Sequence, residues 1–241
     1  MLVVIVIIGI LGSALVVSVQ SGYKQARQAN CKSNLRQFGV ALTIYRGEHD
    51  NQTPDWLSNL YPDYVDDRSM YVCRSDKNAG QNILRPPEYV QSINDNSTLD
   101  APAFRDNDTG TGSTRNPAVM TCSYFYEFSA ASVPSGWKAA NAVQRNTMRD
   151  YKMDQMTYGD ENNQDKNNNV MPYSASRIPI IRCYHHWKDM KLYGVAYAQR
   201  NTRTASRQPI TINVAYAGNV FVGPPWWEGT LHPGETQSTG Q

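Results

Sequence analysis

The stretch that decides the fold is MLVVIVIIGILGSALVVSVQSG, residues 1–22. It contains no charged side chain, and the first charged residue of the chain is Lys24. About twenty helical residues at ~1.5 Å each span the ~30 Å hydrocarbon core of a bilayer. A helix also satisfies its own backbone hydrogen bonds, which a segment inside lipid must do. The stretch therefore predicts a membrane-spanning helix over residues 1–22.

The side chains of this first helix are expected to face lipid or other helices. The residues concerned are Leu2, Val3, Val4, Ile5, Ile8, Gly9, Leu11, Gly12, Leu15 and Val16. The two glycines stand three apart and leave room for a neighbouring helix. The alternative is a cleaved secretory signal peptide. An anchor is favoured because no Lys or Arg precedes the run, the run exceeds about 15 residues, and no clear small-x-small cleavage site follows it.

The helix is predicted to continue through residues 23–47, which contain no proline. Its apolar residues stand four, three, four and three apart, which places them on one face that we expect to pack on a sheet. They are Cys31, Leu35, Phe38, Leu42 and Tyr45. Basic residues fall on the other faces, and Gly47, Asp50, Asn51 and Pro54 are expected to end the helix. One helix of roughly 45 residues, ~65 Å long, would thus be apolar all round at first and amphipathic afterwards.

These residues resemble the N-terminal helix of the type IV pilin-like superfamily, which includes the pseudopilins of type II secretion. The resemblance lies in the Leu/Val/Ile run with Ile-Ile-Gly-Ile-Leu at 7–11, and in Ala-Arg-Gln-Ala-x-Cys-x-x-Asn-Leu-Arg-Gln at 26–37. Downstream, Cys73-Arg74-Ser75-Asp76 is similar to a Cys-Pro-Ser-Asp element of proteins with a prepilin-type cleavage/methylation segment. The resemblance covers about the first 76 residues and is patchy beyond them.

The resemblance implies a subunit held in the bacterial inner membrane by a single span, with its domain in the periplasm or, once assembled, in a surface filament. Other pilin-like subunits would be its partners, and a prepilin peptidase would process the full-length precursor. Such proteins carry a basic leader and a Phe-Thr-Leu-Ile-Glu segment before the apolar run, so we expect the natural frame to continue upstream of Met1. The family's orientation is preferred to the charge count, which places Lys24 and Arg27 after the span.

Beyond the first helix we expect an α+β domain over residues 23–229 and a disordered tail over residues 230–241. Strands are predicted at 119–128, 178–183, 210–216 and 220–222, the last two as a hairpin. Short helices are predicted at 55–62 and 139–150, and residues 153–158 as a strand or the approach to one. Residues 77–118 and 160–169 are rich in Asn, Asp, Gly and Thr, which predicts loop-rich insertions.

Four cysteines are present, Cys31, Cys73, Cys122 and Cys183, and no two of them form a CxxC pair. An even number in an exported domain favours disulfides over four buried thiols, and four cysteines allow three pairings. We favour Cys73–Cys183 because each follows a short apolar approach. Cys31 would then face Cys122 across the helix–sheet interface.

Two groups of residues are candidate metal ligands. The run Cys183-x-His185-His186-x-x-Asp189 could bind a transition metal, but adjacent histidines on a strand point to opposite faces, so surface histidines are favoured. Asp160, Glu161 and Asp165 could bind Ca²⁺, although the stretch lacks the spacing of an EF-hand and an Asn-rich solvated loop is the commoner outcome. We expect no other cofactor.

The function expected from these observations is structural. The sequence has no G-x-S-x-G, HExxH or phosphate-binding glycine loop, so we expect no enzyme activity. The net charge of +2 decides nothing about nucleic acid, but no basic block with interleaved aromatic residues is present, so no nucleic-acid partner is expected. The alternatives are a membrane-anchored module that binds polysaccharide or another surface ligand, and a metal-dependent exported enzyme around the two adjacent histidines.

Overall fold

The structure is a computed structural model of the whole chain. It describes residues 2–77, 79–80, 116–131, 133, 145–159, 165, 167–186, 191–192, 208–209 and 211–223. Of residues 1–18 only the helical backbone from residue 2 is described. The predicted loop at 77–118, the predicted helix up to residue 144 and the predicted tail at 230–241 lie almost wholly outside these ranges.

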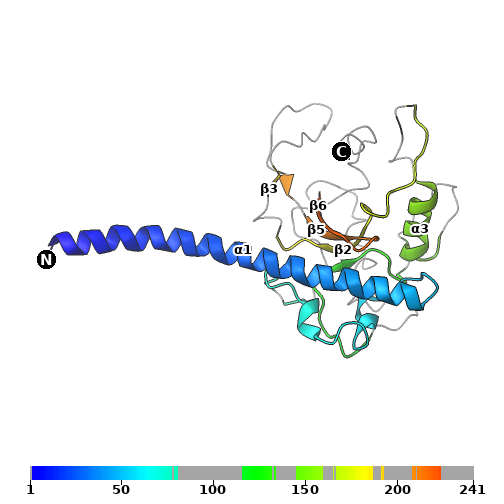
Figure 1. Cartoon of the computed structure of the whole chain (residues 1–241), viewed down its shortest axis with the longest axis horizontal. Coiled ribbons are helices and arrows are strands. Elements are labelled where there is room, and N and C mark those ends of the chain that lie inside the picture. The colour runs from blue at the N-terminus through cyan, green and yellow to red at the C-terminus, as the bar shows by residue number, and fades with distance from the viewer. Residues whose placement is uncertain are drawn as a thin grey trace.

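Helix α1 is a single helix of 47 residues, Leu2–Glu48. It extends far beyond the rest of the domain at its N-terminal end (Figure 1). Residues 19–27 are exposed, and Cys31 is the first residue along the helix, among those whose side chains are described, that is buried. Asp50 and Asn51, at φ 50° and 63°, turn the chain out of the helix, so the helix ends just beyond Gly47 rather than at it. The predicted continuous helix is confirmed.

Within the part of the chain that the structure describes, no helix combines the length and the hydropathy needed to cross a membrane.

The sheet has four antiparallel strands in the order β1-β2-β5-β6. They are Phe125–Tyr126, Pro179–Cys183, Thr211–Ala215 and Val220–Gly223. Arg182 pairs with Phe125 on one side and with Asn213 on the other. A hairpin joins β5 to β6, and Gly218 in its turn has φ 90°, which favours glycine. A separate pair is formed by β3 (Lys191–Leu192) and β4 (Gln208–Pro209). The predicted α+β class, the strand at 178–183 and the hairpin are confirmed.

The second half of α1 covers one face of this sheet. Phe38 is fully buried and meets Tyr71 and Tyr124 edge-on, with ring centroids 4.9 and 5.7 Å away. A Cβ built at Gly39 would lie 2.5 Å from the carbonyl oxygen of Gly218, so only glycine lets α1 approach the β5–β6 turn this closely. Cys31, Leu35, Phe38 and Leu42 are buried and Tyr45 is partly buried against the same core, which places the whole predicted stripe on the sheet side.

Three predictions of secondary structure were wrong in extent or type. The predicted strand at 119–128 is reduced to Phe125–Tyr126, because Cys122 and Ser123 donate instead to the carbonyls of Gly80 and Tyr71. Helix α3 is Met148–Tyr158, so residues 153–158 are helical and do not form the predicted strand. The Thr147 side chain caps this helix by accepting from the Asp150 amide at 3.2 Å.

The predicted helix at 55–62 is shorter and of a different type. It is a 3₁₀ turn, η1, Leu57–Leu60, and a second turn, η2, is Arg68–Tyr71.

Candidate metal centre

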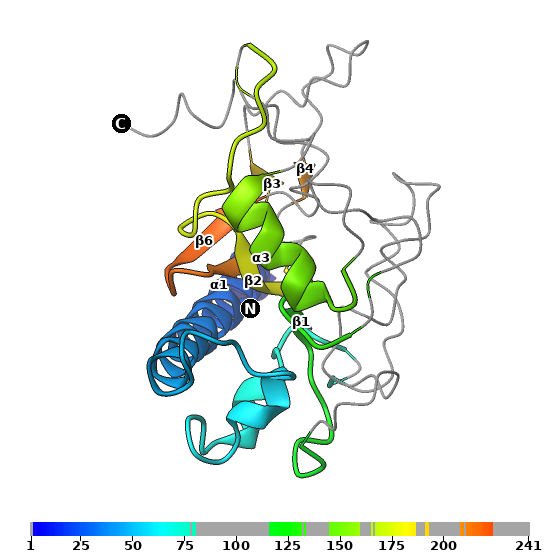
Figure 2. The same cartoon turned by 90° about the vertical axis from the view of Figure 1, so that its right-hand side faces the viewer.

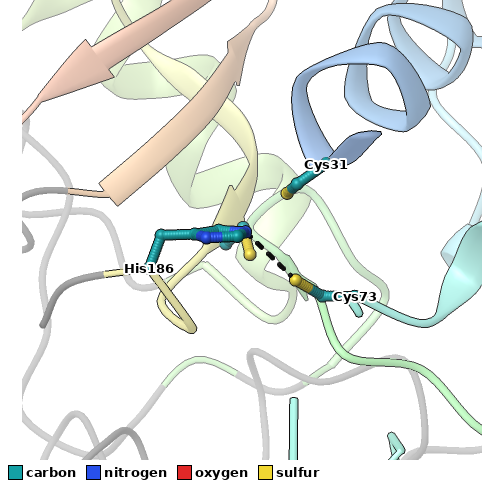
Figure 3. A group of neighbouring side chains, drawn as sticks. Cys31, Cys73 and His186 are labelled. Atoms are coloured by element: carbon teal, nitrogen blue, oxygen red, sulfur yellow. Dashed lines mark hydrogen bonds between the residues drawn. The ribbon is translucent and has the colours of Figure 1, made fainter. Parts of the chain in front are cut away.

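Four buried side chains from three separate segments of the chain meet at the edge of the α1–sheet interface. They are Cys31, Cys73, Cys183 and His186, each at most 1% exposed. One donor atom from each, three Sγ and one imidazole nitrogen, can be chosen so that all lie within 4.8 Å of one another. Figure 3 shows the Cys31 side chain on α1, with Cys73 below it and His186 pointing toward both from the other side of the group. We call these four residues the Cys₃His cluster.

Each donor is placed by the element that carries it. Cys31 lies on the sheet-facing stripe of α1, and one turn later the Asn34 side chain donates to the Met70 carbonyl at 3.3 Å, which fixes η2 beside the helix. Cys73 follows η2 by two residues. Cys183 is the last residue of β2, and the turn after the strand brings His186 back to the same point. The spacing Cys-x-x-His at the end of β2 therefore supplies two donors from one short segment.

The imidazole of His186 is held by a hydrogen bond on each nitrogen. Its Nε2 lies 3.2 Å from Cys73 Sγ, and its Nδ1 lies 3.3 Å from Ser75 Oγ. When the Nδ1–H donates to Ser75, the Nε2 lone pair faces the three sulfurs. A hydrogen bond on the far nitrogen is what orients most metal-binding histidines in proteins.

The thiols of the cluster differ in acidity. Hydrogen bonds from Cys183 and then Cys31, together with the His186 imidazole, hold the pKa of Cys73 well below its usual range. Burial raises the pKa of Cys183 well above its usual range.

A group of hydrogen-bonded polar residues, which we call the polar frame, lies next to the cluster and consists of Asp76, Gly80, Ser123 and His185. The carboxylate of Asp76 accepts from the Gly80 amide at 2.8 Å and from Ser123 Oγ at 2.6 Å, which ties the loop after Cys73 to the segment before β1. His185 Nε2 lies 3.1 Å from the Ser123 carbonyl oxygen and 3.5 Å from an Asp76 oxygen. The two adjacent histidines therefore serve different sites: His186 lies in the cluster, and His185 lies against the frame.

The donor set is the one that structural zinc sites use. Zn²⁺ binds Cys₃His sets tetrahedrally, with Zn–S about 2.3 Å and Zn–N about 2.0–2.1 Å, so donors in a closed site lie roughly 3.5–3.8 Å apart. Donors that already lie within 4.8 Å of one another need shifts of less than about 1 Å each to reach that geometry. The soft sulfur donors favour zinc over calcium or magnesium.

The predicted disulfides are not formed: all four cysteines are free. Cys73 and Cys183 do lie near each other, as the favoured pairing requires, but Cys31 joins them instead of facing Cys122. Cys122 lies outside the cluster, with its Sγ 3.7 Å from the Tyr124 carbonyl oxygen. The physical reason is that β2 and η2 converge on the sheet-facing side of α1, which brings three sulfurs and one imidazole to a single point.

The predicted calcium ligands cannot be assembled from the described residues. Asp160 and Glu161 lie outside them, as does Asp189 of the predicted transition-metal run. Asp165 is partly exposed in an Asn-rich turn, where it accepts from the amides of Asn167 and Asn169 at 2.8 Å each. Hydrogen bonds from the side chain and backbone of Asn169 lower the pKa of Asp165, which is explained by the turn itself.

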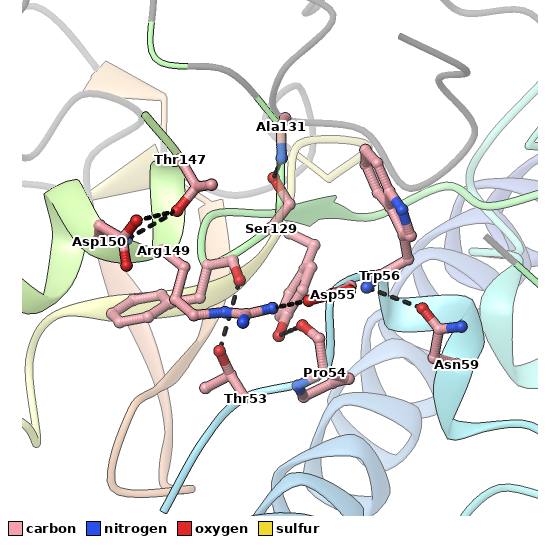
Figure 4. A network of polar contacts seen from close by, with 12 residues as sticks. Thr53, Pro54, Asp55, Trp56, Asn59, Ser129, Ala131, Thr147, Arg149 and Asp150 are labelled. Carbon is pink, nitrogen blue, oxygen red and sulfur yellow. Dashed lines mark hydrogen bonds and ion pairs between the residues drawn. The ribbon is translucent and has the colours of Figure 1, made fainter. Parts of the chain in front are cut away.

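A second polar network, away from the Cys₃His cluster, ties the segment after α1 to the start of α3 (Figure 4). Arg149 forms an ion pair with Asp55, and its amide donates to the Ser129 carbonyl at 3.0 Å. The amide of Ala130 donates to the Asp55 carbonyl at 2.9 Å. These groups pair with one another across three segments. The network therefore has a structural role that accounts for it, and we do not treat it as a ligand site.

Sequence reasoning found His186 and all three cysteines but did not group them. The local signal is the Cys-x-x-His spacing at 183–186, but the predicted Cys73–Cys183 disulfide and the opposite directions of adjacent histidines on a strand argue against a metal there. No sequence pattern identifies Ser75 and Asn34 as the residues that position the donors.

A comparison of the chain with protein-family models, with curated proteins and with solved structures finds no match. Its function therefore has to be inferred from the residues and geometry described above.

Proposed function

We propose that the chain is a membrane-anchored subunit of a type IV pilus-like or type II secretion pseudopilus filament. The main support for the proposal is that α1 has two parts: a first part that projects from the domain and a second part that packs on the sheet. The helix runs unbroken from Leu2 to Glu48, Cys31 is the first buried residue among its described side chains, and the preceding part extends away from the domain (Figure 1). A helix that leaves its own domain in this way needs another partner for any apolar surface it carries.

The length and composition of the projecting part support a membrane and then a filament core as that partner. Residues 2–22 carry no charge and at ~1.5 Å per residue extend over ~30 Å, the thickness of the hydrocarbon core. The next residues, 23–30, are mostly polar and mostly exposed, which suits the passage from lipid into water. On this proposal the domain lies in the periplasm, or on the cell surface once the subunit is assembled.

Assembly follows from burial. When the apolar helix leaves the membrane, its side chains must be covered by other apolar helices, because exposing them to water is unfavourable. A head-to-tail contact whose rotation does not close gives an open helical filament instead of a ring. The partners are then copies of this chain or other pilin-like subunits.

The substitution Ile8→Asp tests the proposal. It places a charge that costs ~2.5–3.5 kcal/mol at the centre of a membrane helix on insertion scales, and the charge would be unpaired in a filament core. We expect filaments to disappear, counted by electron microscopy of sheared surface material and normalised to subunit in the membrane fraction. The matched control, Ile8→Leu, keeps the apolar volume and should form filaments as the wild type does.

Deletion of residues 1–22 completes the test. Because the buried stripe from Cys31 to Tyr45 is retained, the shortened chain should be a soluble monomer whose sheet is intact by circular dichroism. If it assembled as well as the full chain, the helix would be only a tether. The anchored binding module would then be the better account of the molecule.

A further inference from the structure

We propose that Cys31, Cys73, Cys183 and His186 bind one Zn²⁺ ion, and that this ion fastens α1 to the domain at the point where the helix leaves it. The proposal does not depend on filament assembly. It rests on the four donors that converge within 4.8 Å, their complete burial, and their distribution over α1, the loop after η2, the end of β2 and the following turn.

The arrangement fits a structural site and does not fit a catalytic one. Catalytic zinc keeps a coordination position open for water or substrate, whereas structural zinc is closed by four protein ligands. Here four protein donors are available, and none is more than 1% exposed, so no position is left for an exchangeable ligand. The Ser75 hydroxyl at 3.3 Å from His186 Nδ1 supplies the outer hydrogen bond that such a histidine uses.

A metal also accounts for the set better than a disulfide does. A Cys73–Cys183 bond would leave the Cys31 thiol and the His186 imidazole buried beside it without a shared role. Zinc uses all four groups at once, because each cysteine binds the metal as a thiolate and the imidazole binds through its free nitrogen. It also matches the free state of all three cysteines in this structure.

The position of the cluster gives the ion its role. Cys31 is the first buried residue along the described side chains of α1, and residues 19–27 before it are exposed. The other three donors come from the loop after η2 and from the end of β2 with the turn that follows it. Zinc would therefore cross-link the helix to β2 and to the loop after η2 at the neck, by which we mean residues 28–34 of α1.

Metal analysis of the full-length chain tests the site. The protein is produced with zinc chloride in the medium, purified in detergent under reducing conditions and measured for bound metal. We expect about one zinc per chain, and less than about a tenth of that in Cys31→Ser and in His186→Ala. The matched control is Cys122→Ser, which removes a buried thiol outside the cluster and should keep the wild-type zinc content.

Two measurements remain informative if a cluster variant does not fold. Cobalt(II) added to the metal-free wild type should give the intense visible bands of tetrahedral Co²⁺ and the near-ultraviolet bands of thiolate coordination. Ser75→Ala, which keeps all four ligands, should weaken zinc affinity about tenfold or more. Absence of both the zinc and the cobalt bands, or a mass two hydrogens lighter that marks a disulfide, would overturn the metal site.

Hydrogen exchange tests the role at the neck. Removing zinc with a chelator should speed amide exchange in residues 28–34 by tenfold or more, while the β5–β6 hairpin changes little. If zinc were bound but its removal left the neck unchanged, the fastening role would be wrong. Filament counts do not enter any of these measurements, so the metal site and the filament proposal fail separately.

Discussion

The face of the sheet that packs on α1 and the face that looks toward α3 are both buried, but their chemistry differs. On the α1 side, alternate residues of β2 and β5 are Ile181, Cys183, Ile212 and Val214, and all are apolar or thiol. On the other side, the intervening residues are Arg182, Thr211 and Asn213, each at most 2% exposed. The sheet thus presents an apolar face to α1 and a polar face on the side where Lys152 of α3 lies (Figure 2).

The polar face is held together by a buried charge network. Glu127 accepts from Arg182 at 3.2 Å, and Lys152 of α3 lies 3.5 Å from its other oxygen. Asn213 Oδ1 lies 3.4 Å from Arg182 Nε and accepts from Thr211 Oγ1 at 3.0 Å. Among the ion pairs described there, the Glu127 carboxylate is paired with two cations, Arg182 and Lys152. The apolar face depends on shape and volume, whereas this face depends on charge balance, and the two should therefore respond differently to substitution.

The largest effect is expected from a charge placed on the α1 side. Phe38→Asp removes a fully buried ring and buries an unpaired carboxylate. The loss should exceed the ~5–15 kcal/mol that stabilises a typical domain, so the cooperative thermal transition followed by circular dichroism should vanish. The control is Val40→Asp, two residues away on α1 and 60% exposed, which should melt within a few degrees of the wild type. A folded Phe38→Asp variant would show that α1 is not packed as described.

The next effect is expected on the polar face. Glu127→Gln keeps the shape of the side chain but leaves Arg182 and Lys152 without their shared carboxylate. Breaking a buried ion pair by removing one partner costs ~3–5 kcal/mol. We expect a loss of that size in urea denaturation of the fragment that begins at Tyr23. A loss below about 1 kcal/mol would mean that the network does not hold this face together.

The smallest effect is expected from removing one of the two cations. Lys152→Met preserves volume and leaves the Glu127–Arg182 pair balanced. Replacing part of a buried charge network by an apolar group of similar size is often neutral or stabilising, so the free energy of unfolding should change by less than about 1 kcal/mol. The measurement is the same urea denaturation. A loss equal to that of Glu127→Gln would show that both cations are needed and that the carboxylate is not the centre of the network.

The sequence predicted the regular elements whose signals are local. The four-three spacing from Cys31 to Tyr45 is a property of one helix face, and the β-branched residues of β2 and β5 identify strands wherever their partners lie. The stretch at 119–128 shows the limit. Its aromatic residues are buried, as the pattern predicts, but only Phe125–Tyr126 has a neighbouring strand, and neighbours cannot be read from the stretch alone.

The Cys₃His cluster could not be predicted as a group, because its donors lie on three segments that are far apart in sequence. Its local component, Cys183-x-x-His186, was visible. Whether a buried sulfur is oxidised or binds a metal depends on which other donors the fold brings to it, and that is a tertiary property. Helix α3 differs from the predicted helix at 139–150 for another reason. Its start is set by Thr147-x-x-Asp150, a capping signal in which the Thr147 side chain accepts from the Asp150 amide.

The continuity of α1 also determines how the molecule carries mechanical load. The projecting part and the part seated on the sheet belong to one helix. A pull on the N-terminus therefore acts along the helix axis, parallel to the interface from Cys31 to Tyr45. Such a force shears all the buried contacts together, whereas a force across the axis would peel them apart one by one. The domain is accordingly built to resist tension along its helix more strongly than bending across it.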